Sequence, residues 1–497
     1  MIAWGTPAAR WVLLATITGS GLAFMDASAV NVALEPIGED LHSEIDGLQW
    51  TLNAYTLMLA ALIPLAGSLA DHFGRRRIFV FGVVWFAAAS AMCGFAPSIE
   101  ALIAFRALQG VGGALLTPGS LAILQSSFEP RDRARAIGAW SGLSGIAAAA
   151  GPLIGGLLID ALSWQWIFFV NLPLAALVVY AARHVPETRD RDAVPGFDVA
   201  GAVLLALGLA ATTWALTTAG EQRLSAEVLV VLAAGVVLLV VFTLVEARSP
   251  HPMLPLRLFR ARQFTGANLV TVAVYAALSG MMFLTAVYLQ QIAGFSAVAA
   301  GAAMLPVTVL MLVLSSRAGA LAERIGPRLP MTLGPVVMAC GFLLLLRVGP
   351  DLSYLTVVLP AMIVFGLGLS LTVAPLTATA LAAVEDRYSG IASGVNNAVS
   401  RGAGLLAVAV LPAASGLGGD AFRDPAAFTA GFHAAMAVCA GLLVLGGVLA
   451  FVTIRDRLAP PEPPAAARRP QRTVHCAVDG PPLERPRGAE PAAPPTD

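Results

Sequence analysis

The sequence Gly67-Ser68-Leu69-Ala70-Asp71-His72-Phe73-Gly74-Arg75-Arg76-Arg77 joins two long apolar runs, at residues 48–70 and 78–97. Each run is long enough to cross a bilayer as a helix. The connection is too short to hold a folded domain, and its three arginines mark it as cytoplasmic. Gly67 and Gly74 permit a tight turn and close helix approach, and Asp71 can accept hydrogen bonds from amides at a helix N-terminus. We therefore predict a pair of membrane-spanning helices; the alternative is that the arginines are topology anchors only.

The composition is that of a membrane protein with many spans. Of its 497 residues, 58% are hydrophobic and 12% are charged, whereas a soluble domain has about 25% charged residues. The net charge of zero indicates neither a nucleic-acid partner nor an acidic ligand. The cysteines have neither a disulfide pattern nor metal-ligand spacing, so no metal site is expected. They are Cys93, Cys340, Cys439 and Cys476.

Fourteen segments are predicted to span the membrane by length and apolarity. Their limits are 11–34, 48–70, 78–97, 100–124, 136–158, 164–183, 198–218, 227–247, 264–290, 298–320, 329–348, 353–379, 391–414 and 428–453. An even number of spans puts both termini on one side. Alternate loops carry nearly all the arginines, while the others hold only Arg223, Arg347 and Arg423. The arginine-rich loops and both termini are therefore expected in the cytoplasm of a cell (inner) membrane.

The chain is predicted to be all-α, with two similar halves. The sequence Gly319-Ala320-Leu321-Ala322-Glu323-Arg324-Ile325-Gly326 repeats the glycine and acid spacing of Gly67–Gly74. We expect two six-helix bundles, at 1–185 and 261–455, related by a pseudo-two-fold axis along the membrane normal. Two inserted helices occupy 186–260. The Pro-, Ala- and Arg-rich residues 456–497 are expected to form a disordered cytoplasmic tail.

An acid and an arginine inside predicted spans could form a pair. Asp26 lies in the first span and Arg106 in the fourth, at similar predicted depth. A carboxylate in hydrocarbon costs about 2.5–3.5 kcal/mol and marks a functional site by default. Protonation of Asp26 would leave Arg106 in need of another acceptor, which predicts a proton-coupling pair. The alternatives are a structural acid that joins two helices and a static ion pair.

Several motifs resemble those of the major facilitator superfamily. The loop after the second span resembles G-x-L-a-D-x-x-G-R, and the residues around Arg106 resemble the family's R-x-x-Q-G-x-G, whose arginine is associated with proton transfer. Asp26, Asn31, Ala33 and Leu34 match the first helix of the fourteen-helix drug/proton antiporter group. Glu35 stands where that group has proline, which puts the local geometry at this helix end in doubt. Trp50 and Tyr55 match its W-x-x-x-x-Y, and Asn397 and Arg401 its N-x-x-x-R-x-x-G.

The fifth predicted span contains Gly151-Pro152-Leu153-Ile154-Gly155-Gly156. Small residues permit close helix packing, and proline bends the helix. This stretch resembles the G-P-x-x-G-G motif that marks antiporters. We interpret Gly151, Pro152, Gly155 and Gly156 as a hinge between the two halves.

Two further sets of candidate residues follow from these patterns. One set is a cytoplasmic latch: Gly67, Asp71, Gly74, Arg75, Arg76, Glu323 and Arg324. The other is a substrate cavity, in which Met282 would supply an adaptable apolar surface, with lipid-facing packing as its alternative. The cavity candidates are Asn31, Asn53, Tyr55, Gln109, Tyr275, Met282, Tyr288, Asn397 and Arg401.

The resemblance implies a proton-coupled antiporter that exports small amphipathic compounds by alternating access. The proton gradient would supply the energy, so no cofactor, nucleotide or metal is expected. One strong intramembrane acid indicates few coupled protons and a neutral or monocationic substrate. The expected partners are the lipid bilayer, protons and a small molecule, with a periplasmic adaptor if the cell has two membranes and a monomer otherwise.

Other functions remain open at this point. A proton symporter for a nutrient or siderophore would concentrate its compound on the side to which protons move. An exporter of an endogenous secondary metabolite would confer drug resistance as a by-product. A non-transporting sensor has no need of both a buried acid and a hinge motif, and an enzyme would need a nucleophile–base pair, for which the sequence offers no candidate.

Overall fold

The computed structural model describes residues 2–189, 198–222, 225–249, 252, 254–349, 352–384, 389–417 and 424–456. These residues belong to one compact unit that ends at Asp456. The described chain is helical apart from one isolated β-bridge, between Ile2 and Phe128. The predicted disordered tail lies outside the described residues, except for Asp456.

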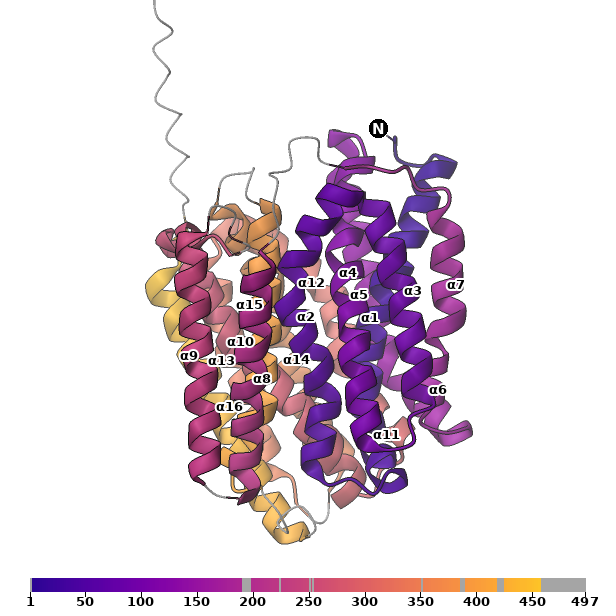
Figure 1. The fold of residues 1–497 in the computed structure, drawn as a ribbon. Helices are drawn as coiled ribbons and strands as arrows, with labels where there is room; N and C mark the ends of the chain where they lie inside the picture. Colours follow the sequence, from indigo (N-terminus) through magenta and orange to yellow (C-terminus); the bar gives the residue numbers. More distant parts are fainter. Residues whose placement is uncertain are drawn as a thin grey trace, which may run out of the picture. The chain divides into compact units, whose positions relative to one another are not determined.

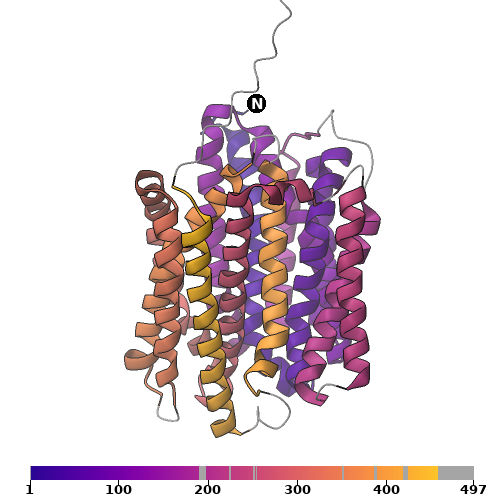
Figure 2. The ribbon, with the colours of Figure 1, turned by 90° about the vertical axis from the view of Figure 1, so that its left-hand side faces the viewer.

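The helices follow the predicted apolar runs (Figures 1 and 2). The first group is α1 (Pro7–Asp40), α2 (Ile45–Phe73), α3 (Arg75–Gly94), α4 (Ile99–Ser127), α5 (Pro130–Ala161), α6 (Trp166–Phe169) and α7 (Asn171–Ala182). Next come α8 (Val199–Gln222) and α9 (Ala226–Arg248). The last group is η1 (Leu256–Arg260), α10 (Arg262–Val287), η2 (Tyr288–Ile292), α11 (Ala297–Ala303), α12 (Leu305–Ile325), α13 (Arg328–Leu344), η3 (Leu345–Arg347), η4 (Tyr354–Val358), α14 (Leu359–Ala382), α15 (Ser389–Ala414) and α16 (Pro425–Thr453).

Within the described residues, thirteen helices are long and apolar enough to cross a membrane. The sixth predicted span is the shorter apolar stretch Trp166–Ala182, which is divided into α6 and α7. Pro173 lies just after the division and has no N–H to donate to the carbonyl of Phe169. With this stretch, the helices account for the fourteen predicted spans, and the predicted fold class is confirmed.

The first helix is longer than predicted at both ends. Thr6 caps its start by accepting a hydrogen bond from the backbone N–H of Ala9 at 3.2 Å, and α1 continues past Pro36 to Asp40. Trp164 Nε1 donates to Asp40 Oδ2 at 2.8 Å, which holds this extension in place. Asp26 is therefore farther from the end of its helix than the predicted limit at residue 34 suggested.

The helices pack in two sets. In the first, α1 packs against α5 and α7, and α4 packs against α2 and α3. In the second, α10 packs against α15 and α16, and α14 packs against α12 and α13. The helix pair α8 and α9 reaches the rest of the structure through α2 and α15. The two sets meet where α2 packs against α15 and where α5 packs against α11.

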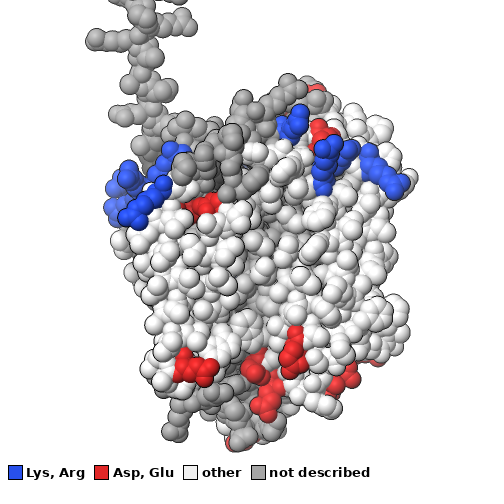
Figure 3. Space-filling view, viewed as in Figure 1, with Lys and Arg blue, Asp and Glu red and all other residues white. Residues whose placement is uncertain are grey.

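The charged side chains divide between the two ends of the helices. Figure 3 shows arginines at the end where α1 begins and only acidic side chains at the opposite end of the visible face. We call these the arginine-rich end and the acidic end. The turn between α2 and α3 lies at the arginine-rich end, and the α1–α2 turn lies at the acidic end (Figure 1).

Candidate functional site

Asp26 and Arg106 form an ion pair inside the first set of helices. Arg106 Nη1 donates to Asp26 Oδ2 at 2.6 Å, and each residue is only 1% exposed. The predicted contact between α1 and α4 is therefore present, although its role in proton coupling stays a prediction. A charge pair this deeply buried is costly unless its remaining donors and acceptors are also satisfied.

Neutral polar side chains satisfy the carboxylate. Gln109 Nε2 and Asn171 Nδ2 donate to Asp26 Oδ1 at 2.8 and 3.0 Å. Both amides also donate to Ser90 Oγ. The sequence analysis named Gln109 but missed Asn171 and Ser90, whose only signal was a polar residue within an apolar run. Four helices, α1, α3, α4 and α7, thus meet at a single carboxylate.

The guanidinium has further partners of its own. Arg106 Nη1 donates to Gln109 Oε1 at 2.6 Å, and Nε donates to the backbone carbonyl of Thr51 at 3.1 Å. Its Cζ lies 4.4 Å from the centroid of the Tyr55 ring, close enough for a cation–π interaction. Arg106 would keep these acceptors if Asp26 became neutral.

Two glycines of the R-x-x-Q-G-x-G sequence explain how α4 reaches this position. A Cβ added at Gly110 would lie 2.6 Å from the carbonyl oxygen of Tyr55 on α2. One added at Gly112 would lie 2.6 Å from the backbone nitrogen of Phe86 on α3. Only glycine permits such close backbone approach, so this sequence places Arg106 and Gln109 against their partners.

The predicted hinge residues pack in two directions. A Cβ added at Gly151 would lie 2.7 Å from the carbonyl oxygen of Met25, next to Asp26 on α1, and Gly155 faces Ala29. On the other side, a Cβ added at Gly156 would lie 2.6 Å from Val298 Cα on α11. The carbonyl of Pro152 contacts Gly301 of α11. This part of α5 therefore joins the two sets of helices toward the acidic end.

Arg401 is another arginine within a predicted span. It lies near the middle of α15 and is half-buried. It makes no hydrogen bond or ion pair with any residue that the structure describes. Because α15 packs against α2 and α10, which carry Tyr55 and Tyr275, these three cavity candidates lie on helices that pack together.

The other cavity candidates are dispersed. Asn53 is 1% exposed, and its Nδ2 has no partner among the described residues. Tyr288 packs against Phe428 and Phe432, and its hydroxyl lies 3.2 Å from Thr429 Oγ1. The remaining candidates stay predictions: Asn31, whose Nδ2 donates to the carbonyl of Ala27; Met282, which packs against the buried apolar core; and the exposed Asn397, whose Nδ2 donates to the carbonyl of Ser393.

Only part of the predicted latch is described. The side chains of Asp71 and Glu323 lie outside the described part of the chain. Gly74 has φ 108°, a conformation that favours glycine, and it forms the turn between α2 and α3. A Cβ added at Gly67 would meet nothing within 4 Å, so the close approach predicted there is absent from this structure. Arg324 is exposed in the last turn of α12.

Glu187, which the sequence analysis did not name, contacts two arginines at the start of α3. Its Oε1 accepts a hydrogen bond from the backbone N–H of Arg76 at 3.1 Å. Its Oε2 lies 3.6 Å from Arg76 Nε and 3.8 Å from Arg77 Nε. The backbone N–H of Arg75 donates to the carbonyl of Thr188 at 2.8 Å. The segment after α7 therefore caps the start of α3.

The second set of helices repeats this arrangement. Gly326 has φ 90°, and Asp456, which follows α16, accepts a hydrogen bond from the backbone N–H of Arg328 at 3.1 Å. An acid after the last helix of each set thus caps the start of the helix that follows the repeated glycine turn. Similar sequence signals were present at residues 187 and 456, where an acid follows a long apolar run.

Comparison with known proteins agrees with this arrangement. The family model of the Major Facilitator Superfamily matches residues 16–408. The chain belongs to the Major Facilitator Superfamily. It is a multi-pass membrane transporter of small molecules, and transporters of this superfamily generally need no cofactor. Among the described residues, no group of three or more potential metal ligands occurs.

Curated relatives are 34–36% identical to this chain over the aligned residues. The chain is 36% identical to the puromycin resistance protein pur8 of Streptomyces alboniger over 91% of this chain and 92% of that protein. It is 36% identical to the multidrug resistance protein Stp of Mycobacterium tuberculosis strain H37Rv, over 78% and 72% of the two chains. It is 34% identical to the tetracenomycin C resistance and export protein of Streptomyces glaucescens, over 80% and 74%.

Solved transporter structures share the fold at low identity. One is a bacterial homologue of the human lysosomal transporter Spinster, with a TM-score of 0.64, 18% identity, and coverage of 92% of this chain and 100% of that chain. Another is the peptide transporter POT in complex with sulfate, with a TM-score of 0.65, 16% identity, and coverage of 90% and 94%. These similarities support the helical arrangement alone.

Proposed function

We propose that this transporter exports small amphipathic compounds in exchange for protons. The observation that carries the proposal is the buried Asp26–Arg106 ion pair, surrounded by neutral donors and acceptors. A buried carboxylate is costly to keep within a membrane span. Proton transfer is a usual role of an acid at this depth. The relatives named as resistance and export proteins support export over uptake.

The surroundings of the pair suit a change of protonation. With Asp26 ionised, its carboxylate binds Arg106, Gln109 and Asn171. With Asp26 neutral, Arg106 would still have Gln109 Oε1, the Thr51 carbonyl and the Tyr55 ring as partners. The neutral state of Asp26 therefore leaves the donors of Arg106 with acceptors but removes the counter-ion of its charge, so proton uptake would weaken the contact between α1 and α4.

The exchange cycle follows from this arrangement. The compound binds while Asp26 is ionised and the arginine-rich end is open. After the helix sets rock, a proton from the opposite side neutralises Asp26 and the compound leaves. Packing of Gly156 and Pro152 against α11 would close the acidic end in one half of the cycle. The latch residues around Gly74, Arg75 and Arg76 would close the other end in the second half.

The membrane orientation belongs to the same proposal. The arginine-rich end would face the cytoplasm, with both termini on that side, and the distribution of charges in Figure 3 supports this. The two helix sets would be the rocking bundles, at residues 1–185 and 261–455, with residues 186–260 as the insertion. The transporter would work in the cell membrane as a monomer, or with a periplasmic adaptor in a cell with two membranes.

A second candidate is the export of a metabolite made by the cell itself. The tetracenomycin C resistance and export protein and the probable actinorhodin transporter of Streptomyces coelicolor, 34% identical over 81% of this chain, favour it by their names. Deletion of the gene followed by profiling of secreted compounds would separate this role from general drug export.

Transport in reconstituted vesicles tests the proton coupling. The wild-type protein should drive dye out of the compartment that mimics the cytoplasm when an inward proton gradient is imposed. Asp26→Asn should abolish gradient-driven efflux, because the amide cannot exchange a proton. Glu39→Gln is the matched control, since Glu39 is exposed at the end of the same helix and should leave efflux intact. Normal gradient-driven efflux by Asp26→Asn would refute the coupling role.

A further inference from the structure

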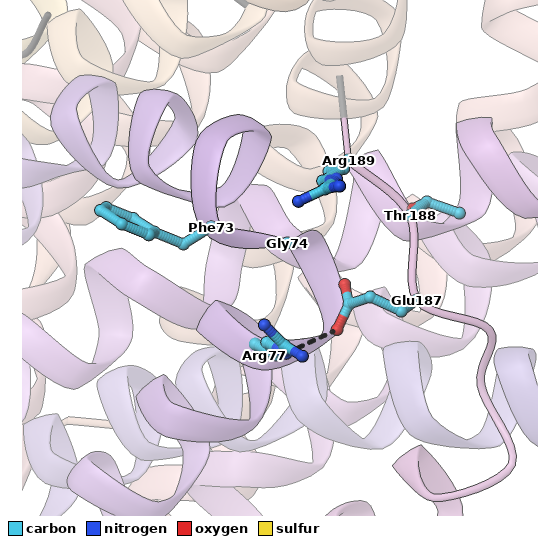
Figure 4. Close-up of a pocket in the computed structure, with 6 residues that line it drawn as sticks. All are labelled: Phe73, Gly74, Arg77, Glu187, Thr188 and Arg189. Atoms are coloured by element: carbon cyan, nitrogen blue, oxygen red, sulfur yellow. Dashed lines mark ion pairs between the residues drawn. The ribbon is translucent and has the colours of Figure 1, made fainter. Parts of the chain in front are cut away.

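A pocket lies beside the α2–α3 turn at the arginine-rich end (Figure 4). Its volume is about 440 Å³. Arg77 comes from the start of α3, whereas Glu187, Thr188 and Arg189 come from the segment after α7 (Figure 4). The lining residues are Phe73, Gly74, Arg77, Glu187, Thr188 and Arg189. The proposed transport cycle uses the turn at Gly74 to close this end but assigns no ligand to the pocket.

Among the described residues, the arginines around the pocket are only partly neutralised. Glu187 is shared between Arg76, at 3.6 Å, and Arg77, at 3.8 Å. The side chain of Arg77 is 76% exposed. Arg189 makes no hydrogen bond or ion pair with any of the residues that the structure describes. Among the described side chains, one carboxylate is shared by two guanidinium groups and a third guanidinium has no partner, so these side chains have a net positive charge.

The position of the pocket along the helices matches the surface of a membrane. Phe73 is the last residue of α2, and the apolar run of α3 begins at Ile78. Phe73 lines the pocket and is 55% exposed, and its ring points away from Arg77 and Arg189 (Figure 4). An exposed apolar ring next to a group of basic residues at a helix end fits the boundary between lipid tails and headgroups.

We propose that this pocket binds the phosphate of an anionic phospholipid, with Arg77 and Arg189 as its ligands and Phe73 against the start of an acyl chain. A guanidinium offers paired N–H donors that match two phosphate oxygens. Glu187 lies 3.8 Å from Arg77 and neutralises it only in part, because the side chain and the backbone N–H of Arg76 also hold its carboxylate. The exposed Phe73 favours a lipid over free inorganic phosphate. The bound lipid would tie the α2–α3 turn to the segment that leads into α8.

Native mass spectrometry of the delipidated full-length protein tests this assignment. The probes are phosphatidylglycerol, phosphatidylcholine with the same acyl chains, and inorganic phosphate. Because each arginine near an anionic surface contributes about 1 kcal/mol, Arg77→Gln with Arg189→Gln should weaken phosphatidylglycerol binding roughly 30-fold. Arg248→Gln is the matched control, since Arg248 is exposed in the last turn of α9 at the same end, and should change the affinity less than about twofold.

Each outcome decides the proposal. Unchanged phosphatidylglycerol binding by the double variant would overturn it, as would an equal loss in Arg248→Gln. Displacement of the lipid by millimolar inorganic phosphate would show a free-anion site and overturn the lipid assignment. If the double variant does not fold, Arg189→Gln carries the test alone, because it breaks no contact among described residues, and a loss of about fivefold is expected. No transport is measured, so the result is independent of the proposed exchange.

Discussion

Replacing Arg106 with alanine should destabilise the folded transporter strongly. The change removes the 2.6 Å contact to Asp26, the donor to Gln109 Oε1, the hydrogen bond to the Thr51 carbonyl and the stacking on Tyr55. Asp26 would keep only two neutral amide donors, from Gln109 and Asn171. Its negative charge would then be buried without a counter-ion.

The size of the effect follows from the burial of the pair. Because both side chains are at most 1% exposed, water does not screen the charge that is left behind. Removal of one partner of a buried ion pair costs about 3–5 kcal/mol. Removal of both charges, in Asp26→Asn with Arg106→Gln, should cost clearly less than the two single changes together, because neutral amides can hydrogen-bond to each other. The interaction energy should therefore be at least about 1–3 kcal/mol.

Equilibrium unfolding in mixed micelles, with all four members of the double-mutant cycle, measures this energy. The reasoning fails if Arg106→Ala lowers the free energy of unfolding by less than about 1 kcal/mol. It also fails if the effects of the Asp26 and Arg106 changes add to within about 0.5 kcal/mol. In that case, removing one partner would not strand a costly buried charge, and protonation of Asp26 could not act as a switch.

Three further changes test other parts of the structure. Gly156→Ala should lower the free energy of unfolding by about 1–3 kcal/mol, because its Cβ would lie 2.6 Å from the backbone of α11. The control Gly145→Ala, whose Cβ would meet nothing within 4 Å, should not lower it. Equal losses in the two variants would contradict the close contact at Gly156. Arg401→Gln should lower the KM for a cationic dye relative to that for an anionic dye by about tenfold, since it removes a positive charge that has no partner among the described residues. Arg401→Lys should leave this KM ratio unchanged. Equal KM ratios in the wild type and both variants would exclude Arg401 from the substrate path. Glu187→Gln should cost less than about 1 kcal/mol in thermal unfolding, because Glu187 is 27% exposed; a larger loss would mean that the cap on α3 is stronger than its exposure suggests.

The sequence was sufficient for the fold class because membrane spans carry a strong local signal. A run of about 20 apolar residues can satisfy its backbone in lipid only as a helix. The stretch Trp166–Ala182 kept its apolarity even though it divides into α6 and α7. The end of α1 was misplaced because Pro36 and the polar residues up to Asp40 mark the membrane boundary and not the end of the helix.

Only part of the candidate site could be predicted from the sequence, again because prediction requires a strong local signal. Asp26, Arg106 and Gln109 were visible because a charged or amide side chain is expensive in hydrocarbon and their motifs resemble those of a known family. Asn171 and Ser90 were not found, because single neutral polar residues are common in apolar helices. Glu187 was missed because its contact with Arg76 joins segments that are far apart along the chain.

The amino-acid sequence by itself determined the membrane class, the number of spans, the internal repeat and the acid–arginine pair, since each depends on local apolarity, charge or spacing. Only the tertiary structure decided which neutral groups surround Asp26, that Gly156 faces α11 and that Arg401 has no partner among described residues. These features depend on how helices approach one another, and that approach is set by the fit of side chains from distant segments.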